Sequence, residues 1–124
     1  MKKFSPYYCP LTYATKVISG KWKLFIISRL VEKPLRYGQI KTACETISEK
    51  MLTSQLKELE ADGIITRKIY AEVPPRVEYS LTPFGNNLVD ALAPLHTWGI
   101  DYMAHKKIPF PEHNQKDDYK TSSK

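Results

Sequence analysis

The sequence predicts a mainly α-helical domain with a small β-hairpin, formed by a chain of 124 residues. Residues 48–63 have the pattern of one well-delimited helix, and they follow a shorter helical segment after a brief turn. Two segments rich in β-branched and aromatic residues, 64–70 and 76–81, come directly after that helix. Hydrophobic residues make up 42% of the chain and charged residues 26%, so we expect one folded domain with its own core.

The net charge of +6 indicates an anionic partner, for which nucleic acid, an acidic membrane surface and an acidic protein all qualify. No apolar segment approaches the roughly 20 residues of a membrane span, and the first residues lead into no signal peptide. We therefore expect a cytoplasmic protein without a membrane partner. Cys9 and Cys44 have neither CxxC nor Cys/His spacing, which disfavours a disulfide framework and a bound metal.

The first helix is expected after a flexible N-terminal arm at residues 1–8. Pro10 suits the first turn of a helix, which makes Cys9 its N-cap. The second helix, residues 22–32, is almost continuously apolar, so we expect it to be the buried centre of the fold. Pro34 prevents its continuation.

Residues 35–44 predict a third, short helix, and residues 45–47 connect it to the next one. The helix at 48–63 has Ser48 as its N-cap and Gly63 just past its end. A short helix, a tight turn and a longer helix form a helix-turn-helix, in which the second helix enters the major groove of DNA. Helix pairs of this kind also occur without nucleic acid.

The 48–63 helix has two different faces. Leu52, Leu56 and Leu59 recur at helical spacing and predict a buried side. The opposite side carries polar and basic residues, namely Lys50, Thr53, Ser54 and Lys57. Such side chains donate hydrogen bonds to phosphate oxygens and base edges, as a helix in a major groove must. A solvated amphipathic helix would show the same pattern.

The two predicted strands are joined by residues 71–75, whose two prolines make the connection too stiff for a tight turn. A helix-turn-helix followed at once by such a projecting hairpin is a winged helix. Arg67, Lys68 and Arg76 place positive charge where a wing meets the DNA backbone, and we expect Arg76 to reach toward the minor groove. Arg67 and Lys68 fit equally well as ordinary surface charges.

A final helix begins at Thr82-Pro83, which supply a good N-cap and first position. Its apolar residues repeat at intervals of three and four and include Leu88, Leu92, Leu95, Trp98 and Tyr102. This stripe exceeds what one small domain needs, so we predict a homodimer held by the first and last helices. The alternative is that the stripe packs back on the core. Pro94 predicts a kink or break.

Together the elements predict a winged helix-turn-helix over residues 9–104, with additional N- and C-terminal dimerisation helices. Residues 105–124 are polar and proline-marked, so we expect a disordered tail.

Several segments of the chain closely resemble the HxlR-type family of bacterial winged-helix transcriptional regulators, which has a MarR-like architecture. They are CP at 9–10, GKWKLFII at 20–27, PLRYGQI at 34–40, ISEKMLTSQLKELEADGII at 47–65 and YAEVPPRVEYSLTPFG at 70–85. The resemblance implies a dimeric regulator that binds double-stranded DNA at paired half-sites. It places Lys50, Thr53, Ser54 and Gln55 at the major groove, Arg36 and Tyr37 at phosphates, and Arg76 in the wing. Gln55 lies toward the edge of the buried stripe.

Cys9 carries the most reactive chemistry that the sequence offers. A thiol at a helix N-terminus near Lys2, Lys3 and Lys16 favours the thiolate, which is the form that oxidants and electrophiles attack. Some members of the resembling family sense oxidants through a cysteine placed in this way. A small, buried packing residue is the equal alternative for Cys9, and Cys44 is expected in the core.

No pattern in the chain predicts an enzyme or a cofactor. Nothing in the spacing places Cys9 beside a histidine, and neither a phosphate-binding glycine loop nor a pair of catalytic acids occurs. Three further alternatives stay open: control by an unknown small-molecule effector, regulation without a sensor, and a winged helix used for protein contact.

Overall fold

The structure is a computed structural model that describes residues 9–109. Its elements in chain order are α1 (Pro10–Ile18), α2 (Lys23–Leu30), β1 (Leu35–Arg36), α3 (Tyr37–Cys44), α4 (Glu49–Ala61), β2 (Ile65–Tyr70), β3 (Arg76–Leu81) and α5 (Pro83–His105). The predicted arm at residues 1–8 and most of the predicted tail, residues 110–124, lie outside the described residues. The first residue of that predicted tail, His105, still belongs to α5.

One hydrophobic core joins α2, α3, α4 and the sheet. The predicted stripe of α4 is buried, because Leu52, Leu56 and Leu59 are at most 2% exposed. It packs in one cluster with residues of α2 and α3, among them Ile26, Ile27, Leu30 and Ile40. The prediction that α2 is the buried centre holds for one side of the helix only, since Leu24 and Val31 remain exposed.

The third helix is shorter than predicted, because Leu35 and Arg36 form strand β1 instead of its first turn. Leu35 pairs with Tyr79 and Arg36 with Glu78, so the sheet has three strands in the order β1-β3-β2. The helix begins at Tyr37, two residues later than predicted, and the Gln39 side chain accepts a hydrogen bond from the Arg36 N–H (2.9 Å). That bond caps α3 at Arg36, and Leu35 and Arg36 pair with β3.

Helix α4 has the predicted boundaries. The Ser48 Oγ accepts a hydrogen bond from the Met51 N–H (3.0 Å), which satisfies one donor of the first turn. Gly63 follows the helix with a φ of 77°, a left-handed conformation that glycine adopts without strain. The turn before α4 contains Glu45 at a φ of 59°, where a side chain is disfavoured.

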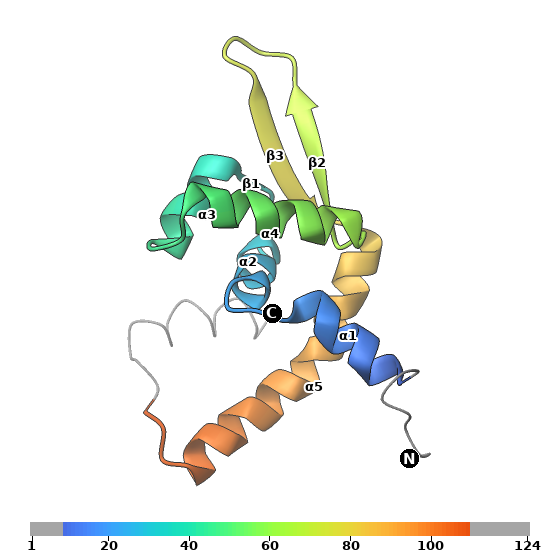
Figure 1. The fold of residues 1–124 in the computed structure, drawn as a ribbon, viewed down its shortest axis with the longest axis vertical. Coiled ribbons are helices and arrows are strands. Elements are labelled where there is room, and N and C mark those ends of the chain that lie inside the picture. The colour runs from blue at the N-terminus through green and yellow to red at the C-terminus, as the bar shows by residue number, and fades with distance from the viewer. Residues whose placement is uncertain (1–8, 110–124) are drawn as a thin grey trace.

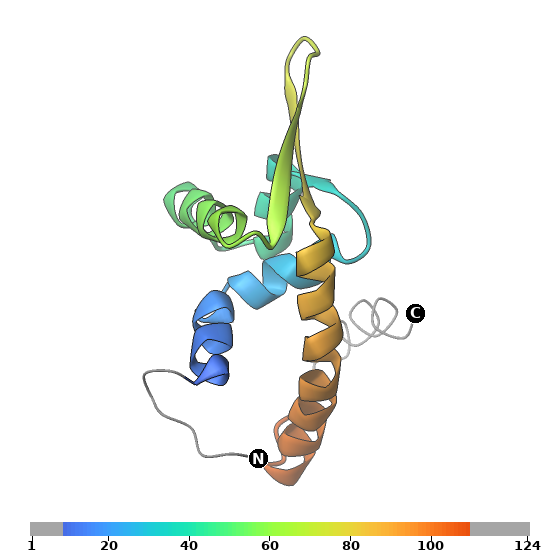
Figure 2. The same ribbon diagram turned by 90° about the vertical axis from the view of Figure 1, so that its right-hand side faces the viewer.

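The hairpin of β2 and β3 projects from one end of the molecule as the predicted wing (Figure 1; Figure 2). The strands pair antiparallel from Ile65 opposite Leu81 to Tyr70 opposite Arg76. Helices α3 and α4 lie beside the base of this hairpin. A helix pair followed by such a hairpin is the winged helix that the sequence predicts.

Helix α5 is tied to the core at its beginning and leaves it at its end. The Thr82 Oγ1 accepts a hydrogen bond from the Gly85 N–H (2.9 Å), as expected of an N-cap. Figure 1 shows that α5 changes direction about halfway along its length, and Pro94 is its middle residue. The helix therefore bends but does not break. Its second half extends away from the other elements in both views.

Among the described residues, no helix combines the length and the apolar character needed to cross a membrane.

Candidate nucleic-acid interface

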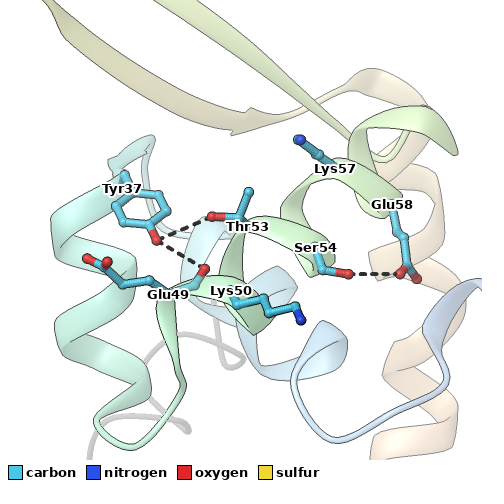
Figure 3. A pocket seen from close by; sticks show the side chains of 7 residues that line it. All are labelled: Tyr37, Glu49, Lys50, Thr53, Ser54, Lys57 and Glu58. Carbon is cyan, nitrogen blue, oxygen red and sulfur yellow. Dashed lines mark hydrogen bonds between the residues drawn. The ribbon is translucent and has the colours of Figure 1, made fainter.

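An open groove of about 620 Å³ runs along the exposed face of α4, as Figure 3 shows. Its lining residues are Tyr37, Glu49, Lys50, Thr53, Ser54, Lys57 and Glu58. The structure therefore brings together five of the residues predicted to contact DNA, four from α4 and one from α3. Glu49 and Glu58 add two carboxylates that the prediction did not assign to this surface.

The N-terminal end of the groove is fixed by Tyr37. Its hydroxyl donates to the Glu49 carbonyl oxygen (3.4 Å) and lies 3.5 Å from the Thr53 Oγ1. These contacts join the first turn of α3 to the first turns of α4. A phosphate contact by Tyr37 would therefore be made by a side chain whose orientation is already set.

Lys50 and Lys57 provide the positive charge of the groove. Both side chains are exposed, and within residues 9–109 neither forms an ion pair. Their ammonium groups are therefore available to an anion that approaches α4.

The end of the groove away from Tyr37 contains a chain of polar contacts that begins in the core. Lys23, at the start of α2, is 5% exposed, and its Nζ lies 2.6 Å from the Glu58 Oε1. The Ser54 hydroxyl donates to the Glu58 Oε2 (3.3 Å). The hydrogen bond and positive charge of Lys23 lower the pKa of Glu58. Glu58 is therefore a carboxylate at neutral pH, and the buried Lys23 side chain fixes its position.

Gln55 and Arg36 lie beside the groove rather than in it. Gln55 is half-buried, and a Cβ built on Gly20 would lie 3.8 Å from its Oε1, so it faces the connection between α1 and α2. Arg36 lines a second groove of about 570 Å³ on α3, together with Gly38, Gln39 and Thr42. The two predicted contacts therefore belong to the margins of the α4 surface.

Arg76 lies at the tip of the wing, next to the loop between β2 and β3, and is held by its neighbours. Its guanidinium contacts Glu72 (3.1 Å) and Glu78 (3.5 Å) and stacks 4.0 Å from the centre of the Tyr70 ring. The Tyr70 hydroxyl in turn donates to Glu78 (3.2 Å). The predicted extension of Arg76 toward a minor groove would require it to leave both carboxylates. In this position it stiffens the hairpin.

Cys9 is the N-cap of α1, as predicted, but it is only 6% exposed. A reagent must therefore displace neighbouring side chains to reach the thiol. Cys44 is buried in the core, and this burial raises the pKa of its thiol, which opposes reaction.

The apolar stripe of α5 is divided between the core and the surface. Leu88 packs against the core and Leu92 is half-buried, whereas Leu95, Trp98 and Tyr102 are between 44% and 61% exposed. The Trp98 and Tyr102 rings stack on each other with their centres 5.4 Å apart. The second half of α5 therefore presents an apolar surface that no other described element covers.

Comparison with known proteins gives a consistent result. Residues 17–107 match the HxlR-like helix-turn-helix family. An HTH-type transcriptional regulator of Halalkalibacterium halodurans, BH0655, is 49% identical over 92 residues, which are 73% of this chain and 81% of the relative.

Solved structures share both the sequence and the fold. A MarR-family regulator from Porphyromonas gingivalis W83 is 42% identical with a TM-score of 0.72 and covers 80% of this chain and 97% of its own. The redox regulator HypR in its oxidised form is 42% identical with a TM-score of 0.69, covering 75% of this chain and 96% of its own. These relatives are regulators and not enzymes. The chain belongs to the HxlR-like helix-turn-helix family of transcriptional regulators.

Proposed function

We propose that the protein is a homodimeric, sequence-specific regulator that places α4 in the major groove of double-stranded DNA. The observation that carries this proposal is the α4 groove, in which two lysines that form no ion pair within residues 9–109 flank the Thr53 and Ser54 hydroxyls. Lysines donate to phosphates, and hydroxyls donate to or accept from base edges. A regulator of this kind acts on chromosomal DNA and therefore in the cytoplasm.

Residues around the groove would fix the register of the complex. Arg36, exposed at the start of α3, and Tyr37 lie where phosphates would flank α4. In the wing, Lys68 is exposed and stands 4.8 Å from the Tyr70 ring, next to the Arg76 cluster. We propose that the wing contacts the backbone as a stiff unit, with Arg76 supporting it.

The DNA-binding proposal is tested with charge reversal of Lys50 and Arg76 together. We expect Lys50→Glu/Arg76→Glu to lose at least a hundredfold in duplex affinity, because the Lys50 contact becomes repulsive and the wing loses the cation that compensates Glu72 and Glu78. The matched control is Lys33→Glu, in the loop between α2 and β1, which lies on the opposite side of the hairpin from α4 (Figure 2). Unchanged affinity in the double variant, measured by fluorescence anisotropy, would contradict the proposal.

In the proposed dimer, the exposed second half of α5 packs against the same helix of the second subunit. Leu95, Trp98 and Tyr102 make the contact, and Leu88 and Leu92 lie on the core side of it. Exposed apolar patches of this kind mark association surfaces. On α1, Leu11 and Tyr13 are also exposed, at 54% and 60%. Two copies joined in this way would present two α4 helices to one duplex.

Cys9 is the proposed position for a response to oxidants or electrophiles. The proposal is supported by its place at the first turn of α1, whose exposed side chains belong to the proposed dimer surface, and by the likeness to the redox regulator HypR. We expect diamide to release the wild-type protein from its operator and to leave Cys9→Ser bound. Equal loss of binding in both proteins would remove Cys9 from this role. Cys44→Ser is the control and should respond as the wild type does.

A further inference from the structure

Lys23 is the one buried charged residue of the described chain. Its ammonium group forms an ion pair with Glu58. An ammonium group taken out of water is stable only when an anion compensates it. The Glu58 Oε1 supplies that anion at 2.6 Å, across a separation of 35 residues in the sequence. The contact therefore anchors the side chain of Glu58, although half of that side chain is exposed.

The second oxygen of Glu58 sets the orientation of Ser54. A carboxylate can only accept hydrogen bonds, so the 3.3 Å contact between the Ser54 Oγ and the Glu58 Oε2 uses the serine proton. The hydroxyl then has no proton left to offer to DNA. Ser54 and Glu58 together present only acceptor lone pairs to the groove.

The acceptors of Ser54 and Glu58 are placed to contact base edges rather than phosphates. Ser54 lies on α4 opposite the buried stripe, and Glu58 follows it by four residues on the same side. Both line the same groove as Lys50 and Lys57 (Figure 3). The lysines compensate the repulsion between the carboxylate and the DNA backbone.

An acceptor pair in the major groove distinguishes the four bases. Guanine and thymine present acceptors there, and adenine presents its N7 acceptor beside its amino group. Cytosine presents an amino group with no neighbouring acceptor, and carboxylates are known partners of this group. Cytosine is therefore the base that fits the Ser54 and Glu58 oxygens.

We propose that Glu58, oriented by Lys23, is a specificity residue that selects cytosine at one position of each operator half-site. This inference rests on the proposed insertion of α4 into the major groove. Lys23 is a positioning residue, since it acts on DNA only through Glu58. Because the pKa of Glu58 is lowered, the carboxylate keeps its acceptor character throughout the neutral range.

The test is Glu58→Gln, which keeps the shape of the side chain and an acceptor for Lys23. Lysine has only donors, so the amide oxygen should face Lys23 and the NH2 group should face Ser54 and the groove. The site then changes from acceptor to donor. We expect a roughly tenfold preference for cytosine in the wild type. In Glu58→Gln, this preference should be lost or should change to a preference for guanine or thymine.

Preference is measured by titrating duplexes that carry each of the four base pairs at every position of an operator selected from random DNA. Glu60→Gln is the matched control, because it removes the same charge from the same helix outside the groove. It should leave the base profile unchanged. Should Glu58→Gln bind all duplexes more tightly with an unchanged profile, the carboxylate acts only by its charge and the proposal is overturned.

Lys23→Met provides an independent variant. We expect it to weaken the cytosine preference at the same position and to leave other positions unchanged, which a purely structural role would not do. A profile identical to the wild type in a folded Lys23→Met protein would exclude the positioning role. If the wild-type protein selects no sequence at all, the proposal for α4 itself fails, an outcome distinct from the failure of the Glu58 assignment.

Discussion

Glu58 and Lys23 link folding stability to pH at the scale of single residues. The ordinary pKa of a glutamate is 4.5, and the hydrogen bond from Lys23 lowers the pKa of Glu58 in the folded protein. A lowered pKa means that the folded state binds the proton less readily than the unfolded state does. The resulting stabilisation is full above pH 4.5 and is lost as the pH falls through the lowered value.

The expected consequence is a flatter pH profile for Glu58→Gln. Its free energy of unfolding should lie below that of the wild type at pH 7, and the difference should shrink on acidification below the ordinary glutamate pKa. Urea unfolding at a series of pH values measures this. Glu60→Gln is the control, and parallel profiles for Glu58→Gln and the wild type would show that the ion pair does not stabilise the fold.

Gly85 is required for a steric reason. A Cβ at this position would lie 2.1 Å from the Ile64 carbonyl oxygen, a backbone atom that cannot move aside cheaply. We expect Gly85→Ala to lower the free energy of unfolding by about 1–3 kcal/mol or more, as overpacking does. Gly38→Ala in α3 is the control, since a Cβ there meets nothing within 4 Å, and it should change stability by at most about 1 kcal/mol in the favourable direction. Thermal unfolding checks both, and equal stabilities would contradict the packing argument.

At the scale of elements, helix α4 is held in place by more contacts than the sequence alone predicts. Ser48 caps the helix, Tyr37 joins its first turns to α3, and Lys23 joins its second half to α2 through Glu58. Preorganised binding groups lose less conformational entropy when they bind. The wing is likewise stiffened by the cluster of Tyr70, Glu78 and Arg76.

The second half of α5 is the element on which the proposed assembly depends. We expect Trp98→Glu to weaken the dimer at least tenfold, because it places a charge in an apolar contact. Sedimentation velocity at micromolar concentrations measures the change. Ile69→Glu in the wing is the matched control, since Ile69 and Trp98 are both 61% exposed and belong to β2 and to the second half of α5, which lie toward opposite ends of the molecule. A monomeric wild-type protein would contradict the assembly.

At the scale of the whole molecule, the salt dependence of DNA binding counts the subunits on one duplex. Each neutralised phosphate contributes about 0.9 to the slope of log K against log salt. If a dimer binds, Lys57→Ala removes one contact from each subunit and should reduce the slope by about 2. A reduction of about 1 would instead indicate that one subunit binds. Lys33→Ala, away from α4, should leave the slope unchanged.

The sequence alone predicted most of the element boundaries, because these are set by neighbours in the chain. The cap at Ser48, the left-handed Gly63 and the opening Thr82-Pro83 all act within a few residues. The exposed face of α4 followed from helical periodicity for the same reason. Strand β1 was missed because two residues carry too little pattern, and only its pairing with β3 makes it a strand.

The tertiary structure decided which polar groups are partners. Lys23 in a nearly continuous apolar segment is the one sequence signal that a carboxylate must lie nearby, but nothing local identifies Glu58. The wing residue Arg76, expected to reach toward the minor groove, is bound by Glu72 and Glu78, and the α5 stripe is divided between core and surface. Caps and periodicity act through adjacent backbone, whereas partners of charges and covered apolar faces depend on segments that meet only after the chain has folded.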